Sequence, residues 1–134
     1  MKIELSSKQF RRLLDLVYIG NWVLNSARGN DRIPDFDNVE SYIFSQCPKF
    51  DMSSLCELSD GEVIPSRAFS EGGIHEAIMD YEDSVFFDIL ADELSGRDCD
   101  TGTIAYDELP LRRECYLNEF LENGITNVSV DIPL

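Results

Sequence analysis

The segment of the sequence best suited to chemistry is residues 98–108, which lies between two predicted helices. Counted from Arg97, Gly102 and Glu108 occupy positions six and twelve of an EF-hand calcium loop. That register puts a cation where the first carboxylate belongs, and a shift by one residue loses both the glycine and the final glutamate. Because neither register supplies more than half of the ligands, a plain turn is favoured. A metal-binding helix–loop–helix regulatory protein is kept as an alternative.

The single histidine and the cysteines complete no catalytic or metal motif. His75-Glu76 lacks the second histidine of an H-E-x-x-H zinc site, because Met79 stands in its place. No two cysteines have C-x-x-C spacing, so we expect reduced thiols. An enzyme is a further alternative, with Cys99 and His75 as its least unsuitable reactive groups. We therefore predict no catalytic residue, no cofactor and no metal ligand. The cysteines are Cys47, Cys56, Cys99 and Cys115.

Charge is the most unevenly distributed property of the sequence. The 134 residues include 26 acids and 11 bases, which gives a net charge of -15. Residues 1–67 have a net charge of -2, whereas residues 68–134 hold 16 acids and 3 bases, a net charge of -13. This imbalance argues against direct binding to nucleic acid or to an anionic membrane, since both attract lysine and arginine. It fits either a solvated surface or a docking surface for a basic protein.

The docking interpretation points to one acidic stretch of the chain. Its expected partner-binding residues are Glu76, Asp80, Asp88, Asp92 and Glu93. The last three face outward on a helix over residues 83–94 if Phe86, Ile89 and Leu90 face the core. The sequence therefore predicts a non-enzymatic protein-binding module, inhibitor-like, immunity-like or regulatory, that acts through its acidic C-terminal half.

The first strongly patterned element is a helix that Ser6 or Ser7 is expected to cap and that runs to about Ala27. Between Leu13 and Leu24 this helix is apolar nearly all round, which is typical of helices buried on several sides. We expect it to be the central helix of the fold, with Trp22 largely buried. A second use of the helix as a subunit interface leaves a homo-oligomer open.

Four shorter helices are predicted after this one. Asp37 and Glu40 have capping-box spacing at the start of the first of them, and Gly124 ends the last. Between the helices, Asp60-Gly61 is typical of a tight hairpin, although its arms are short enough for an exposed loop, and Gly72-Gly73 predicts a break. The helices are expected over residues 38–47, 74–80, 83–94 and 108–123.

The two clearest strand patterns lie near the ends of the chain, at residues 2–5 and 127–132. Because a lone strand leaves its backbone groups unpaired, we expect these two to pair with each other. The expected fold is a mostly helical α+β single domain over residues 1–134, with about five helices and a small sheet joining the terminal strands. No signal-peptide pattern follows Met1, so a cytoplasmic protein is expected.

Overall fold

The computed structural model describes residues 1–133 and divides into two compact units, residues 1–78 and residues 79–134, called below the N-terminal and C-terminal units. The fold is mostly helical with one two-stranded antiparallel sheet, so the predicted α+β class is confirmed. The expectation of a single domain stays a prediction. None of the helices within residues 1–133 is long and apolar enough to cross a membrane.

Helix α1 (Ser7–Asn25) begins at the predicted cap. The Ser6 hydroxyl accepts a hydrogen bond from the Gln9 amide, and the Gln9 side chain accepts one from the Ser6 amide. One face of α1 is buried, with Phe10 and Leu14 in the core. Trp22 is 37% exposed and Leu16 is 68% exposed, so the prediction of a helix buried on several sides is wrong. The physical reason is that, within the N-terminal unit, the second helix and the segments around the hairpin cover only one face of α1.

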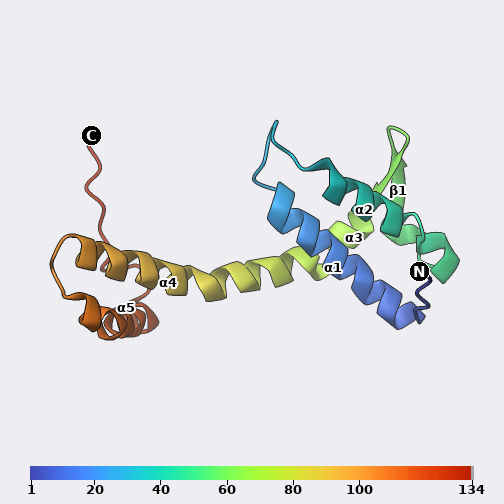
Figure 1. Ribbon diagram of the computed structural model, residues 1–134. Helices are drawn as coiled ribbons and strands as arrows, with labels where there is room; N and C mark the ends of the chain where they lie inside the picture. The colour runs from blue at the N-terminus through green and yellow to red at the C-terminus, as the bar shows by residue number, and fades with distance from the viewer. Residues whose placement is uncertain (134) are drawn as a thin grey trace. The chain divides into compact units, whose positions relative to one another are not determined.

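Helix α2 (Pro34–Phe44) lies against α1 in the N-terminal unit (Figure 1). It begins four residues earlier than expected, because Pro34 suits the first helical position, where no N–H is needed. Asp37 is therefore inside the helix and not its cap. The loop before α2 is closed by Asn25, whose side chain donates to the Ile33 carbonyl and accepts from the Ile33 amide.

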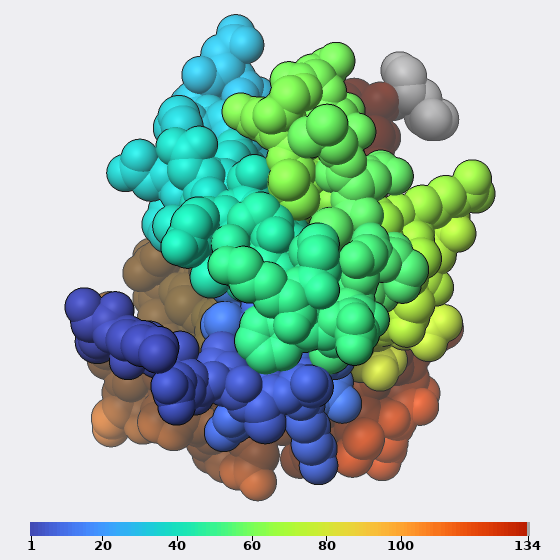
Figure 2. All heavy atoms as spheres, turned by 90° about the vertical axis from the view of Figure 1, so that its right-hand side faces the viewer, coloured from blue at the N-terminus to red at the C-terminus, as the bar shows by residue number. Residues whose placement is uncertain are grey.

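The sheet is the Asp60-Gly61 hairpin, formed by β1 (Cys56–Ser59) and β2 (Glu62–Pro65). Asp60 and Gly61 have φ angles of 50° and 81°, the left-handed pair that a tight two-residue hairpin turn requires. Residues 2–5 and 127–132 form no strand, so the predicted pairing of the terminal strands is wrong. In Figure 2 the N-terminal residues, dark blue, lie on the surface of the N-terminal unit.

The core of the N-terminal unit lies between α1, α2 and the short helices around the hairpin. These are the 3-10 turns η1 (Cys47–Phe50) and η2 (Ser53–Leu55), helix α3 (Arg67–Phe69) and the π turn η3 (Ser70–Ile74). Phe44 and Phe69 meet edge to face with ring centroids 5.0 Å apart. The predicted break at Gly73 is confirmed by its φ of 109°. The buried cluster comprises Phe10, Leu14, Phe44, Cys47, Phe69 and Ile74.

Helix α4 (His75–Asp100) is one continuous helix where two were predicted (Figure 1). In the C-terminal unit it packs against α5 (Leu109–Asn123), which follows the 3-10 turn η4 (Tyr106–Glu108). The rings of Phe87 and Phe120 stack with centroids 5.2 Å apart. Gly124 ends α5 with a φ of 57°, as predicted.

Candidate functional site

The five predicted partner-binding residues all lie on α4. Glu76 belongs to the N-terminal unit and the other four to the C-terminal unit. Asp80 and Glu93 are exposed and take part in no ion pair within residues 1–133. Asp88 and Asp92 are also exposed, but both contact the guanidinium of Arg113 on α5. Within the described residues, the structure therefore leaves part of the predicted acidic surface unpaired and places a single cation against Asp88 and Asp92.

The predicted inward face of α4 is partly wrong. Phe86 and Ile89 are 50% and 56% exposed, whereas Phe87, Ala91 and Ser95 point toward the interior of the C-terminal unit. Phe86 and Ile89 share one exposed face with two acids, because Glu82, Phe86, Ile89 and Glu93 follow at steps of four, three and four residues. This α4 face combines apolar contact area with negative charge.

Asp98 is the one buried carboxylate of the C-terminal unit in the described part of the chain. It accepts hydrogen bonds from Arg97 at 2.9 Å, Arg112 at 2.8 Å and the Tyr116 hydroxyl at 2.6 Å. These donors, Tyr116 above all, hold the pKa of Asp98 well below its usual range. Asp98 therefore joins α4 to α5 as a structural anion.

The loop that resembles an EF-hand uses its carboxylates for other contacts. Both oxygens of Asp98 are taken by arginine and tyrosine donors, and the Glu108 carboxylate accepts from the Ala105 amide at 2.8 Å. Within residues 1–133 no group of three or more histidine, cysteine or acidic side chains is arranged to hold a metal ion. The structure offers no geometry in favour of the metal-binding alternative.

The two groups named for an enzyme, Cys99 and His75, belong to different units of the chain. Burial raises the pKa of the Cys99 thiol, and the nearby Asp100 and Asp98 carboxylates raise it further, so its nucleophilic thiolate is disfavoured. His75 lies in the N-terminal unit, where its Nε2 is 2.6 Å from the hydroxyl oxygen of Tyr18. Cys47, Cys56, Cys99 and Cys115 are free thiols in the structure.

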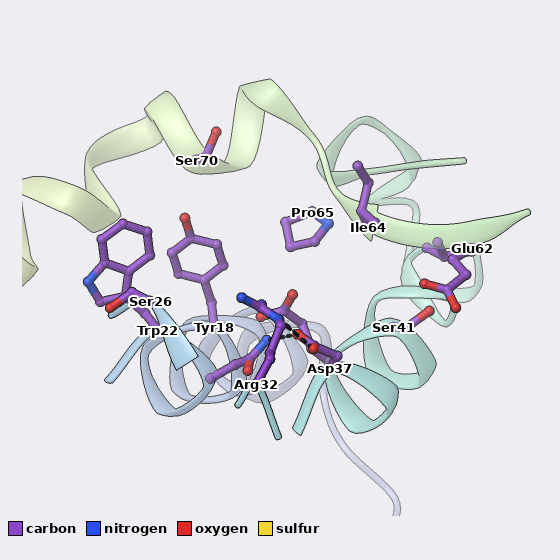
Figure 3. A pocket seen from close by; sticks show the side chains of 13 residues that line it. Tyr18, Trp22, Ser26, Arg32, Asp37, Ser41, Glu62, Ile64, Pro65 and Ser70 are labelled. Atoms are coloured by element: carbon purple, nitrogen blue, oxygen red, sulfur yellow. Dashed lines mark hydrogen bonds and ion pairs between the residues drawn. The ribbon is translucent and has the colours of Figure 1, made fainter. Parts of the chain in front are cut away.

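A pocket of about 680 Å³ in the N-terminal unit was not predicted from the sequence (Figure 3). That volume is within the range of small-ligand sites. Residues of α1, α2, β2 and η3 line it, and Figure 3 shows Tyr18 and Trp22 projecting from α1 toward the segment that carries Ser70.

A polar network forms the floor of this pocket. Arg32 donates to both oxygens of Asp37, at 2.6 and 2.7 Å, in a bidentate pair. The Asn21 amide donates to the same carboxylate at 3.0 Å and accepts from Asn25 at 2.7 Å. The Arg32 hydrogen bond lowers the pKa of Asp37 against the opposing effect of burial. This network fixes the start of α2 against α1.

Glu40 is a further carboxylate in the pocket. Its side chain is half-buried, and burial raises the pKa of its carboxyl although Asn21 acts in the opposite direction. It takes part in no ion pair within residues 1–133, because the nearby Arg32 is held by Asp37. Burial and the Glu40 charge together raise the pKa of the Tyr18 phenol, which is therefore neutral at physiological pH.

The rings of Tyr18 and Trp22 form another wall of the pocket, and His75 packs against both of them. Tyr18 and Trp22 stack with centroids 6.3 Å apart, and His75 meets the Trp22 ring nearly at right angles at 4.6 Å. Trp22 is thus held by neighbours while a third of its surface stays open to solvent. A signal for this pocket was present in the sequence: Asn21 and Asn25, one turn apart on an apolar helix, mark a polar contact on its buried face.

The chain matches no protein-family model, no curated protein and no solved structure. The structure offers two candidate sites, the acidic surface of α4 and the pocket of the N-terminal unit.

Proposed function

We propose that this protein is a non-enzymatic protein-binding module that docks a basic partner on the acidic surface of its C-terminal unit. The supporting observation is that every arginine of this unit is already paired with an acid. The unit contains fourteen acids and three arginines, and all three arginines are bound to Asp88, Asp92 or Asp98. The remaining eleven carboxylates make no ion pair within residues 1–133, so the surface has a large uncompensated negative charge.

The α4 face of Glu82, Phe86, Ile89 and Glu93 is the centre of this proposed surface. Uncompensated carboxylates attract a basic partner over a distance of about one Debye length, roughly 8 Å at physiological salt. The exposed Phe86 and Ile89 add apolar area that is covered only in a complex. The fitting partner is a protein segment with basic and apolar side chains on one face. Free thiols throughout the chain accord with action in the cytoplasm.

Capture from a cell lysate at low and at high salt tests this proposal. The immobilised protein should retain a basic protein at low salt and release it at high salt, because surface charge pairs are screened. Retention of a partner that is neutral or acidic, or that is unaffected by salt, would contradict the proposal.

A further inference from the structure

We infer that the pocket of the N-terminal unit is a binding site for an organic cation, an alkylammonium or guanidinium group, because its lining includes the Trp22 ring and the carboxylates of Glu40 and Glu62. This inference goes beyond the proposed function, since every residue that carries it lies within residues 1–78.

The charges around the pocket leave a net negative site. Its lining includes three carboxylates, those of Asp37, Glu40 and Glu62, and one cation, Arg32. Arg32 and Asp37 cancel each other in their bidentate pair. Glu40 and Glu62, from α2 and β2, have no ion-pair partner within residues 1–133. A ligand with one positive charge would compensate one of these two charges, and a ligand with two would compensate both.

The half-buried carboxylate of Glu40 favours the binding of a cationic ligand. Partial burial disfavours an ionised carboxylate, and this cost is relieved when an opposite charge comes close. A ligand anion is disfavoured for the same reason. The chemistry of the pocket therefore selects for positive charge.

The aromatic wall suits the same ligand. The face of a tryptophan ring attracts ammonium and guanidinium groups, most strongly where water is partly excluded. Trp22 is already oriented by Tyr18 and His75, so little side-chain freedom is lost on binding. The apolar sides of Val63 and Pro65 on β2 can cover the alkyl stem of the ligand.

The sole tryptophan of the chain reports on the pocket directly. Its emission should change saturably when a capped tripeptide with a central arginine or lysine is added. The same tripeptide with citrulline, which has the arginine shape without the charge, should not bind. Spermidine is tested as a further probe. If spermidine binds more tightly than the peptides, the ligand is a free amine. If the peptides bind more tightly, the ligand is a protein side chain.

The double variant Glu40→Gln/Glu62→Gln should bind the arginine peptide about tenfold more weakly or worse, since two charge-assisted contacts are lost. Glu57→Gln is the matched control, because Glu57 is an exposed carboxylate on β1 of the same hairpin but does not line the pocket. Equal weakening by the control, equal binding of the citrulline peptide, or no saturable change would overturn the inference.

Amide chemical shifts of the wild-type protein provide a test that needs no variant. Binding of the arginine peptide should shift the Trp22 indole and the amides of Ser41 and Ile64, which line the pocket from α2 and β2. Shifts confined to residues outside the pocket would overturn the inference, and they would do so without affecting the proposal for the C-terminal unit.

Discussion

Leu14 and Leu16 stand two residues apart on α1 and have opposite environments. Leu14 is fully buried, whereas Leu16 is 68% exposed. We expect Leu14→Ala to lower the free energy of unfolding by about 2–5 kcal/mol, because it opens a cavity in the core. Leu16→Ala should change it by about 0.5 kcal/mol or less. Urea denaturation of both variants measures the difference, and equal effects would show that α1 does not pack as described.

The Asp98 carboxylate should make the folded protein less stable as the pH falls into the acid range. Its pKa is lower in the folded protein than its ordinary value of 3.8, because Tyr116, Arg112 and Arg97 donate to the carboxylate. The stabilisation is therefore complete above the unfolded pKa and is lost as the pH falls toward the folded one.

Asp98→Asn should accordingly lower the urea midpoint at pH 7, and the gap to the wild type should narrow as the pH falls below about 4. Asp100→Asn is the control, since Asp100 is exposed at the end of α4 and makes no ion pair within residues 1–133. A gap that stays constant with pH would mean that the Asp98 charge does not stabilise the fold.

At the scale of elements, replacing glycine by alanine should have opposite effects on stability in the hairpin turn and in α1. Gly61 has a φ of 81°, so Gly61→Ala should destabilise the protein by about 1–2 kcal/mol. Gly20 lies within α1 with open space around it, so Gly20→Ala should stabilise by up to about 1 kcal/mol. Thermal or urea unfolding gives the sign of each change, and two changes of the same sign would contradict the assigned backbone conformations.

Local signals predicted the boundaries that are marked by a capping residue or a glycine. The Ser6 cap, the Asp60-Gly61 turn and the Gly124 stop all appear in the structure. The terminal strands were predicted from alternation alone, but alternation does not supply a partner for the backbone. The predicted division of α4 failed because neither proline nor glycine stands at residues 81–82. The helix also continues past its predicted end at residue 94, because an internal glycine such as Gly96 costs a helix only about 1 kcal/mol.

Of the two candidate sites, the sequence predicted the acidic surface but not the pocket. Net charge is a sum over the residues of the chain, so the sequence alone reveals the acidic half. Pairing depends on contacts between distant residues, and neither the Arg113 contacts with Asp88 and Asp92 nor the Arg32–Asp37 pair could be read from spacing. The pocket itself joins residues 18 to 70 and depends on the tertiary fold.

At the scale of the whole molecule, the central claim is that the position of the free carboxylates matters and not their number. Two triple variants separate these cases, since each changes the net charge from -15 to -12. The first removes unpaired acids of α4, with Asp80→Asn, Glu82→Gln and Glu93→Gln. The second removes exposed acids of the N-terminal unit that make no ion pair within residues 1–133, with Asp35→Asn, Asp51→Asn and Glu57→Gln.

The decisive measurement is the association rate constant of each triple variant with the basic protein captured by the wild type, taken across a range of salt concentrations. The α4 variant should associate about tenfold more slowly at low salt and lose most of its salt dependence, while the N-terminal variant should stay close to the wild type. Equal slowing of both variants, or no slowing of the α4 variant, would contradict docking on the acidic surface of the C-terminal unit.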